Sequence, residues 1–597
     1  MCGICGIIGQ PDPSLLSQMS SRLSHRGPDD SGQYLGKEAA LGFQRLSIID
    51  LEGGHQPMKG CRPIHLVFNG EIYNYRELRE QLSHHPFQSE SDSEVILHLY
   101  EEKGEACVSD LEGMFSFAIW DEENQTLFCA RDRFGKKPFV YWNSPDQFLF
   151  SSELDSLLSH PAIPRRMDRE ALGAYLTYMV VPSPLTMFEG VKKLPPGHTL
   201  TWNAQKDLQV KRYWEVPVKP VPFDRYQTES DLRQILTEAV RVRMHSDVPM
   251  GAFLSGGVDS SLVVGLMTEL GQKVKTFSIG FEEKEFSELD HARVVSDRFG
   301  TDHQEFVVRP DAAELVPTLV ERYGEPFADS SAIPMFLLAQ MTGEHVKVAL
   351  SGDGGDECFG GYLRYQAMEV ISQLGWVPRP FMKVAASLFS RKTGRGERIG
   401  RLLRGGGGSP AQSYLDLVTL FTPEMKERLG VSSEWSDRIL DPFGHVPDDL
   451  VNAAGYTDLM TYLPDDLLVK VDIASMANGL EVRSPFLDPR VVQFAFGIPG
   501  REKRSKSILK SAFGYLLPES ILHRKKMGFG VPLAKWLRED LRDLLTETLL
   551  GKGAKERGVF QVGEVEKLLQ EHLSGQRDHR DRLWILFMFE LWADRFL

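Results

Sequence analysis

The second residue of the chain is a cysteine, a residue type that can act as a nucleophile. Methionine aminopeptidase removes Met1 when a small residue follows it, so we expect Cys2 to become the first residue of the mature chain. Its thiol would then share one residue with a free α-amine, whose ordinary pKa is about 7.7–8.0. The amine can take up the thiol proton, so Cys2 alone would supply both a nucleophile and its base.

Cys2 and Cys5 also form a Cys-x-x-Cys pair, which is typical of redox motifs and of half a zinc site. The redox motif normally lies at a strand-to-helix turn of a thioredoxin-like unit. No second Cys-x-x-Cys or paired-histidine motif follows to complete a zinc site. Both cysteines could instead be core residues, so this pair alone leaves catalysis and the structural alternatives open.

A glycine-rich loop with several hydroxyl groups lies near the middle of the chain. Residues 254–261 read Leu-Ser-Gly-Gly-Val-Asp-Ser-Ser, between an apolar strand-like run and a predicted helix. Such a loop presents backbone N–H groups and hydroxyls to a phosphate at the start of the helix. It lacks the Gly-Lys-Ser/Thr ending of a Walker A loop. Its Ser-Gly-Gly-x-Asp-Ser sequence instead resembles the pyrophosphate loop of ATP pyrophosphatases, which adenylate their substrates; a generic glycine-rich turn is the alternative.

A second glycine-rich loop follows another apolar run. Residues 351–357 read Ser-Gly-Asp-Gly-Gly-Asp-Glu, after the strand-like segment 346–350. Clustered carboxylates repel one another unless a cation lies among them. We therefore predict that Asp259 and Asp356 hold a Mg²⁺ ion that bridges the phosphates of ATP. A solvated acidic turn is the alternative.

The elements that must position these residues differ along the chain. The first two hundred residues contain short apolar, β-branched runs bounded by Gly, Asn, Asp or Pro. Helical stretches at 75–83 and 93–103 interrupt them. The mixture predicts an α+β fold with antiparallel sheets. The strand-like runs are 46–51, 64–68, 115–120 and 139–142.

The later part of the chain has a different pattern. A proline-rich segment, residues 217–223, is predicted to be a stiff linker. The strands and helices expected after it alternate, which predicts a parallel α/β sheet. They are strands at 250–254, 275–279 and 346–350, and helices at 232–244 and 261–270.

From about residue 368 the sequence is mostly helical, and the basic stretch 391–404 is interpreted as a solvated loop.

Four ordered motifs in the first hundred residues resemble the N-terminal-nucleophile glutaminase domain of amidotransferases. They are His-Arg-Gly-Pro-Asp-Asp-Ser-Gly at 25–32, Arg-Leu-Ser-Ile-Ile-Asp at 45–50, Asn-Gly-Glu-Ile-Tyr-Asn at 69–74 and Ser-Asp-Ser-Glu at 91–94. The resemblance covers about two hundred residues and implies a sandwich of antiparallel sheets. Taken singly, Asn69-Gly70 could be a hairpin turn, and Arg45 and Asp92 could be surface charges.

This resemblance implies that Cys2 attacks the side-chain amide of glutamine. The Asn69 side chain and the Gly70 N–H would then stabilise the oxyanion. Arg45 would bind the α-carboxylate of glutamine, and Glu71 and Asp92 its α-ammonium. The residues expected to bind glutamine are Arg45, Leu46, Ser47, Ile48, Ile49, Asn69, Gly70, Glu71 and Asp92.

Segments of the later part extend the resemblance to the whole chain, as a similarity to class B, glutamine-hydrolysing asparagine synthetases. They are 323–334, 463–472, 481–488 and 504–510. The resemblance implies that Leu254 and Ile279 line the adenine–ribose site and that Lys506 neutralises charge on the phosphates during adenylation. The expected ATP-binding residues are Leu254, Ser255, Gly256, Gly257, Asp259, Ser260, Ile279, Ser351 and Gly352.

Asp353 is where the chain departs from the family. The resemblance places there a carboxylate that forms or resolves the acyl-adenylate, and the best-known members carry Glu, which is one methylene longer. Many bacterial relatives with this Asp-containing loop belong to sporulation, polysaccharide or secondary-metabolite contexts. Amidation is therefore the expected chemistry, while the identity of the acceptor carboxylate is less fixed.

We interpret residues 2–215 as a glutaminase domain and residues 225–597 as an ATP-pyrophosphatase synthetase domain with a largely helical C-terminal part. Glutamine, ATP and aspartate would give asparagine, AMP, pyrophosphate and glutamate. The alternative is amidation of another carboxylate, such as a sugar acid. Three other classes are disfavoured. A β-lactam-type synthetase typically lacks the nucleophilic cysteine, and a phosphoribosyl or sugar-isomerising amidotransferase lacks the pyrophosphate loop. A non-enzymatic scaffold protein would have no reason to keep both sets of site residues.

Composition limits the partners and the compartment. The net charge of −15 disfavours bulk binding of nucleic acid. Six cysteines over 597 residues favour reduced thiols in the cytoplasm over a disulfide framework. No run approaches the roughly 20 apolar residues that span a bilayer. A homodimer is implied only by the family resemblance.

Overall fold

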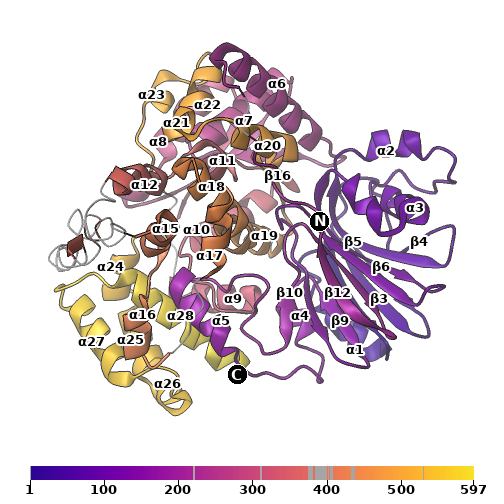
Figure 1. Ribbon diagram of the computed structural model, residues 1–597, viewed down its shortest axis with the longest axis horizontal. Helices are drawn as coiled ribbons and strands as arrows, with labels where there is room; N and C mark the ends of the chain where they lie inside the picture. The colour runs from indigo at the N-terminus through magenta and orange to yellow at the C-terminus, as the bar shows by residue number, and fades with distance from the viewer. Residues whose placement is uncertain are drawn as a thin grey trace.

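A computed structural model of the chain describes residues 2–219, 222–308, 312–373, 381–382, 400, 403, 408–431, 437–528 and 530–597. Figure 1 shows the N-terminal strands gathered on one side and a larger, mainly helical region on the other, with the start of the chain where the two meet. The predicted linker, residues 217–223, lies partly outside the described residues, and the basic stretch 391–404 lies almost entirely outside them.

Two six-stranded antiparallel sheets form the N-terminal sandwich. The first has the order β10-β8-β9-β1-β3-β2 and the second β12-β11-β7-β6-β5-β4. Strands of the first sheet are β1 (Cys2–Ile8), β2 (Asp30–Leu35), β3 (Ala39–Arg45), β8 (Val140–Asn143), β9 (Phe148–Ser151) and β10 (Val191–Lys193). Strands of the second are β4 (Met58–Lys59), β5 (Ile64–Ile72), β6 (Gly113–Asp121), β7 (Thr126–Arg131), β11 (His198–Asn203) and β12 (Lys206–Arg212).

The sandwich has helices on both outer faces. Ile4 and Phe43 of the first sheet pack against Val67 and Trp120 of the second, because alternate residues of each strand point inward. Helices α1 (Pro13–Ser21) and α4 (Leu154–Leu157) cover the first sheet, and α2 (Tyr75–Gln81) and α3 (Glu94–Lys103) cover the second. The predicted α+β sandwich of antiparallel sheets is confirmed.

A five-stranded sheet with only parallel pairings organises the later region, as predicted. Its order is β15-β14-β13-β16-β17. The direction of the strand order changes between β13 and β16, so the loops after these two neighbouring strands lie side by side at their carboxyl ends, the usual place of a ligand crevice in such a sheet. The strands are β13 (Met250–Phe253), β14 (Lys275–Phe281), β15 (Asp302–Val308), β16 (Val348–Leu350) and β17 (Glu481–Arg483).

Helices surround this sheet and dominate the C-terminal part. The first of them are α6 (Arg225–Arg243), α7 (Val258–Glu269), α8 (Leu289–Phe299), α9 (Ala312–Tyr323), α10 (Ala332–Gly343), α11 (Gly355–Phe359) and α12 (Leu363–Gln373). Those that follow are α15 (Pro410–Val418), α16 (Pro423–Arg428), α17 (Asp437–Gly444), α18 (Leu450–Met460), α19 (Leu468–Met476), α20 (Pro489–Gly497), α21 (Gly500–Lys503), α22 (Ser507–Ala512) and α23 (Glu519–Leu522). The last are α24 (Leu533–Arg538), α25 (Arg542–Leu550), α26 (Lys552–Arg557), α27 (Val562–Leu573) and α28 (Arg580–Phe596).

The last helix, α28, packs against the N-terminal region. Helix α5 (Arg169–Tyr178), which precedes the final strands of the sandwich, lies beside α28 (Figure 1). The Tyr175 hydroxyl donates to the Ile585 carbonyl at 2.8 Å, and Phe188 packs edge-on against Trp592 with ring centroids 5.4 Å apart. The hydrophobic core is therefore continuous between the N-terminal and C-terminal regions.

Two local expectations differ from the structure. The run 46–51 is not a strand but a loop after β3, because the carbonyls of Ile49, Asp50 and Leu51 turn toward the Arg45 guanidinium instead of a neighbouring strand. The mostly helical C-terminal part also contains β17, whose three residues are too few to show a strand period. Among the described residues, no helix combines the length and the apolar character needed to cross a membrane.

Candidate active sites

A pocket of about 340 Å³, counting the solvent space at its mouth, lies beside Cys2 at the start of β1. We call it the Cys2 pocket. Of the residues expected to bind glutamine, all but Ser47 and Asn69 line it. The lining is Cys2, Arg45, Leu46, Ile48, Ile49, Gly54, Gln56, Phe68, Gly70, Glu71, Ser91, Asp92 and Glu481.

Asn69, on β5 of the second sheet, bonds Cys2 on β1 of the first. Its Oδ1 accepts the backbone N–H of Cys2 at 3.0 Å. Its Nδ2 is buried and has no hydrogen-bond partner among the described residues. Leaving a buried donor unsatisfied costs about 1–3 kcal/mol, so an oxygen atom bound beside Cys2 would relieve that cost.

The Cys2 thiol is itself enclosed, with 7% of the residue exposed. Burial raises the pKa of this thiol. A nearby base is therefore needed to form the thiolate, which is the reactive form of cysteine.

Arg45 lies opposite Cys2 in the register of β3 against β1. Its guanidinium donates to the carbonyls of Leu51, Ile49 and Asp50 at 3.2, 3.2 and 2.5 Å. It forms no ion pair with any residue that the structure describes. The loop thus fixes the orientation of the cation without neutralising it, which leaves its charge available to a carboxylate ligand.

Three carboxylates that influence one another line the pocket: Glu71, Asp92 and Glu481. Burial raises the pKa of Asp92 to about 6, although the Ile72 N–H donates to it at 2.8 Å. Burial also raises the pKa of Glu71 in spite of Arg483, and Asp92 and Glu481 add to that rise. An ammonium group bound among the three would reduce their mutual repulsion.

Ser47 does not line the pocket; its backbone N–H donates to Asp29 at 2.8 Å. Sequence reasoning missed five lining residues. Ser91 and Glu481 lie inside motifs that carried the family resemblance, so those motifs could have identified them as lining residues. The other three, Gly54, Gln56 and Phe68, lie in no such motif.

Strand β17 joins the Cys2 pocket to the second region. Glu481, at its start, lines the pocket. Arg483, at its end, is fully buried and pairs with Glu71 at 2.9 Å and with Glu481 at 2.5 Å. The Arg483 carbonyl also accepts the Ser351 N–H at 2.8 Å. Three residues therefore connect the pocket to the loop after β16.

A second buried arginine, Arg26 of the N-terminal sandwich, contacts the later region. Arg26 donates to the Cys2 carbonyl at 3.1 Å, to Glu153 at 2.8 Å and to Asp472 on α19 at 2.8 Å. Lys137 reaches the other oxygen of Asp472 at 3.2 Å. These contacts hold the backbone of Cys2 against the second region.

The two glycine-rich loops meet at the crevice where the strand order reverses. Residues 255–260 follow β13 and residues 351–357 follow β16. They are in contact: a Cβ added to Gly352 would lie only 2.7 Å from the Asp259 Cβ. Gly256 has a φ of +65°, the left-handed region that favours glycine. We call this place the phosphate-loop site.

Lys506 occupies the centre of the phosphate-loop site. Its ammonium bonds Asp259 and lies 2.5 Å from Asp356, while Lys526 lies 2.5 Å from the other oxygen of Asp356. Burial alone would raise the pKa of Asp356, but Lys506 and Lys526 hold it at about 2. Ser505 and Lys506 both have positive φ angles, 51° and 63°. Such strain, about 1–3 kcal/mol per residue, is typical of functional sites.

The acidic pair fits a divalent cation. Asp259 Oδ1 is buried without a hydrogen-bond partner among the described residues, and burial raises the pKa of Asp259 despite Lys506. Two carboxylates from adjacent loops are the hard oxygen ligands that Mg²⁺ prefers. The donor set is therefore suited to Mg²⁺ together with phosphate oxygens.

The remaining expected ATP residues surround these loops. Leu254 is buried and continues β13 with an N–H bond to the Phe277 carbonyl at 2.9 Å. Ile279 lies on the neighbouring strand β14. The Ser255 and Ser260 hydroxyls contact each other at 3.1 Å, and the N–H of Gly257 donates to Ser255.

Asp353 is held by its own loop. Its Oδ2 accepts the Ser351 hydroxyl at 2.6 Å, and that hydroxyl also contacts Ser484 at 3.1 Å. The side chain is half-buried. Ser484 follows β17, so Asp353 is connected to the strand that lines the Cys2 pocket.

Two further cations at the loops were missed from the sequence. Lys526 pairs with Asp356, and Arg524 donates to the Gly256 carbonyl at 2.7 Å. Both lie more than 160 residues from the loops they contact, in a basic segment that carries no motif.

Known proteins match the chain over almost its full length. The profile of the asparagine synthase family matches residues 231–594, and that of the glutamine amidotransferase domain matches residues 1–214. Asparagine synthetase [glutamine-hydrolyzing] 1 of Bacillus subtilis is 34% identical, with 99% of this chain and 96% of the relative covered. Asparagine synthetase [glutamine-hydrolyzing] 3 of the same organism is 32% identical, with 92% of each chain covered.

Proposed function

The chain belongs to the family of glutamine-hydrolysing asparagine synthetases, and from that premise we propose that its two sites perform the two halves of one ligation. It is an ATP-dependent carbon–nitrogen ligase that takes its amido group from glutamine and transfers it to aspartate. The residue roles given below are part of the proposal.

In the first half-reaction, the α-amine of Cys2 takes the thiol proton and the thiolate attacks the side-chain amide of glutamine. Asn69 Nδ2 and the Gly70 N–H donate to the resulting oxyanion. Arg45 binds the α-carboxylate, and Glu71 and Asp92 bind the α-ammonium. Ammonia leaves, and water then hydrolyses the thioester to glutamate.

The single observation that carries this assignment is the position of Asn69. It fixes the Cys2 backbone through one side-chain atom and leaves the other, a buried donor, without a partner among the described residues. Such a donor stabilises charge without reorganising during the reaction, which is the basis of an oxyanion hole.

In the second half-reaction, the side-chain carboxylate of aspartate attacks the α-phosphate of ATP, pyrophosphate leaves, and aspartyl-AMP forms. Lys506 moves from its carboxylate partners to the phosphates and neutralises their charge. Ammonia then attacks the acyl carbon and AMP leaves, giving asparagine. We propose that Asp259 and Asp356 hold Mg²⁺, which when bound neutralises phosphate charge.

We propose that Asp353 positions the acyl-adenylate or takes a proton from the attacking ammonia. The Ser351 hydroxyl fixes its carboxylate at 2.6 Å, so the shorter side chain is held in one orientation. Ammonia would pass inside the protein, because in water it would be protonated and lose its nucleophilic lone pair.

We also infer a division into a glutaminase domain, residues 2–215, and a synthetase domain, residues 225–597.

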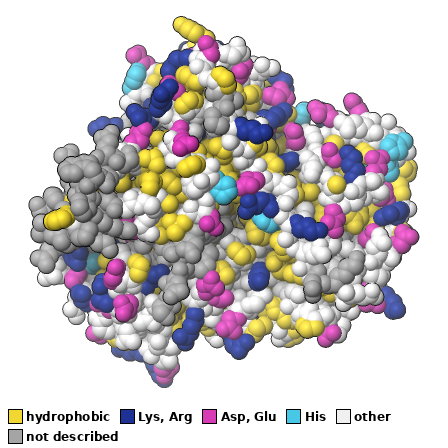
Figure 2. Space-filling view, viewed as in Figure 1, with side chains coloured by type: hydrophobic (Ala, Val, Ile, Leu, Met, Phe, Trp, Pro, Cys, Tyr) yellow, Lys and Arg dark blue, Asp and Glu magenta, His cyan; other side chains and the backbone are white. Residues whose placement is uncertain are grey.

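All six cysteines are free in the structure, which supports a reducing, cytoplasmic location. Acidic and basic side chains are interspersed over the described part of the face in Figure 2, with no surface suited to a nucleic-acid backbone there. A homodimer is proposed from family membership alone.

The direct test is incubation of the purified protein with ATP, Mg²⁺ and glutamine, with and without aspartate. Pyrophosphate and asparagine should appear together and only when aspartate is present. Glutamate formed without asparagine would keep the glutaminase assignment and overturn aspartate as the acceptor.

A further inference from the structure

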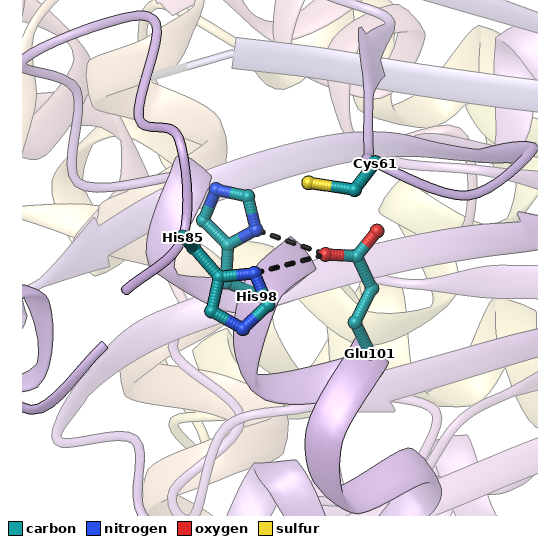
Figure 3. A group of neighbouring side chains, drawn as sticks. All are labelled: Cys61, His85, His98 and Glu101. Atoms are coloured by element: carbon teal, nitrogen blue, oxygen red, sulfur yellow. Dashed lines mark hydrogen bonds and ion pairs between the residues drawn. The ribbon is translucent and has the colours of Figure 1, made fainter. Parts of the chain in front are cut away.

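A group of side chains with metal-binding chemistry lies on the N-terminal sandwich, outside both sites described above. Cys61, His85, His98 and Glu101 each offer one ligand atom, and these four atoms all lie within 4.8 Å of one another. Figure 3 shows them turned toward a common point. None of the four lines the Cys2 pocket.

Three separate segments supply these residues. Cys61 lies in the turn between β4 and β5, and His85 in the connection between α2 and α3. His98 and Glu101 lie on α3, three residues apart and so on one face of the helix. A bound ion would therefore join the turn and the connection to the helix.

The distances fit one small cation. Glu101 Oε2 lies 2.9 Å from His98 Nδ1 and 3.6 Å from His85 Nδ1. Two nitrogen or oxygen ligands on one tetrahedral zinc ion, each at about 2.0–2.2 Å, lie about 3.4 Å apart. The two imidazoles are stacked, with centroids 4.4 Å apart and planes at 25°, so their rings must turn modestly for both Nδ1 atoms to face one ion.

Further contacts orient the ligand atoms. The Arg62 N–H donates to Glu101 Oε1 at 2.9 Å, which leaves Oε2 directed at the histidines. His85 Nε2 contacts Glu102 at 3.2 Å, and His98 Nε2 lies 3.6 Å from Glu94. A carboxylate on the far nitrogen, as on His85, is the arrangement found around metal-bound histidines, where it fixes the ring and the tautomer. The far nitrogen of His98 has no hydrogen-bond partner among the described residues.

Exposure and charge agree with a metal site. His98 and Glu101 have only 3% and 5% of their side chains exposed, whereas Cys61 is exposed and gives an ion access from solvent. One thiolate and one carboxylate balance a divalent charge. Sulfur and imidazole ligands favour zinc over Mg²⁺ or Ca²⁺.

We propose that Cys61, His85, His98 and Glu101 form a structural Zn²⁺ site. On binding, the Cys61 thiol gives its proton to the solvent and its thiolate becomes a ligand. The ion ties the turn before β5 and the connection before α3 to the helix. The site makes no contact with the reacting groups, so zinc acts on local stability and not on the chemistry.

The test is metal binding to the full chain after removal of bound metals with a chelator. Zn²⁺ should bind with a stoichiometry of one, and Co²⁺ in its place should give the intense visible absorption of a tetrahedral site with a thiolate-to-metal band. Octahedral Co²⁺ spectra, or no stoichiometric binding, would overturn the proposal.

Variants locate the site. Cys61→Ser, at an exposed position that should fold, and His85→Ala should each weaken Zn²⁺ binding at least about tenfold, because even residues that only orient ligands are worth about 10–100-fold. Cys61→Ser should also remove the thiolate band. Cys2→Ala and His445→Ala, which change a thiol and an imidazole elsewhere, should bind Zn²⁺ normally; loss of binding in these controls, or unchanged binding in Cys61→Ser and His85→Ala, would place the metal elsewhere.

Discussion

The Cys2 pocket and the phosphate-loop site prepare for their substrates in opposite ways. In the pocket, Asn69 Nδ2 has no hydrogen-bond partner among the described residues, and the Arg45 guanidinium bonds backbone carbonyls but no described carboxylate. At the loops, Lys506 already contacts both Asp259 and Asp356. Asn69 Nδ2 and the charge of Arg45 are thus available to a ligand, whereas the charged groups at the centre of the phosphate-loop site are paired with one another.

Under the proposed assignment, this difference follows from the charge of the substrate that each site binds. Glutamine carries one positive and one negative group, so a rigid pocket with separate counter-charges can bind it without rearrangement. ATP brings several negative charges. When it is absent, the buried carboxylates and lysines of the phosphate-loop site must pair with one another, because an unpaired buried charge is strongly destabilising. The proposal therefore requires the phosphate-loop site to exchange its internal ion pairs for contacts to phosphate and cation as ATP binds.

The sharpest separation of the two sites is Cys2→Ala. Glutamine-dependent synthesis should fall by about 10⁴-fold or more, because no other group replaces the nucleophile, while ammonia-dependent synthesis stays within about twofold. Asparagine formation with each nitrogen source is the measurement. Cys5→Ala, on the same strand but in the core, is the control and should keep both activities; surviving glutamine use in Cys2→Ala would remove the nucleophile assignment.

Asp259→Asn should disable the other site for both nitrogen sources. Loss of a carboxylate beside the phosphates should lower pyrophosphate release about 10³-fold, since cation binding and the position of Lys506 change together. Glutamine hydrolysis measured without ATP should persist. Normal pyrophosphate release would show that this carboxylate does not support the cation.

Asn69→Ala tests the pocket more finely. Removal of one oxyanion donor should lower glutamine-dependent kcat about 10²–10³-fold and leave ammonia-dependent kcat unchanged. Asn74→Ala is a suitable control, because the Asn74 side chain donates to the Asp110 carbonyl and accepts the Glu112 N–H, and it does not line the pocket. Equal losses in the two variants would mean that Asn69 serves only to hold the strand.

The smallest expected effect is a pH dependence confined to the pocket. Asp92 must be ionised to bind an ammonium group, and its pKa is raised to about 6. Glutamine affinity should therefore be complete well above pH 6 and fall about tenfold per unit below it, seen as a rising KM for glutamine. Ammonia-dependent turnover should lack this inflection, and Asp92→Asn should abolish it. The same inflection with ammonia would assign it to the phosphate-loop site.

The sequence predicted those features that depend on residue type. Cys2 and the two glycine-rich loops stand out because few other residues could perform their tasks or adopt their backbone. Asn69 was singled out only by the family resemblance, and the order of strands and helices follows from periodicity. Arg483, Lys526 and the role of Glu481 were not predicted, because their contacts join segments that are far apart in the sequence: Lys526 lies 170 residues from Asp356, and Arg483 lies 412 residues from Glu71. Residues 46–51 were misassigned because an apolar run looks the same whether it pairs with a strand or lines a pocket.

The two regions exchange buried arginines: Arg26 of the sandwich reaches Asp472, and Arg483 of the later region reaches Glu71. Removing one partner of a buried ion pair costs about 3–5 kcal/mol, because the other charge is left without compensation. Neither half of the chain is therefore a self-sufficient module. A hybrid that combines the sandwich with the second half of a distant relative would need the matching counter-charges to be transplanted with it, so recombination between relatives is constrained at these two crossings.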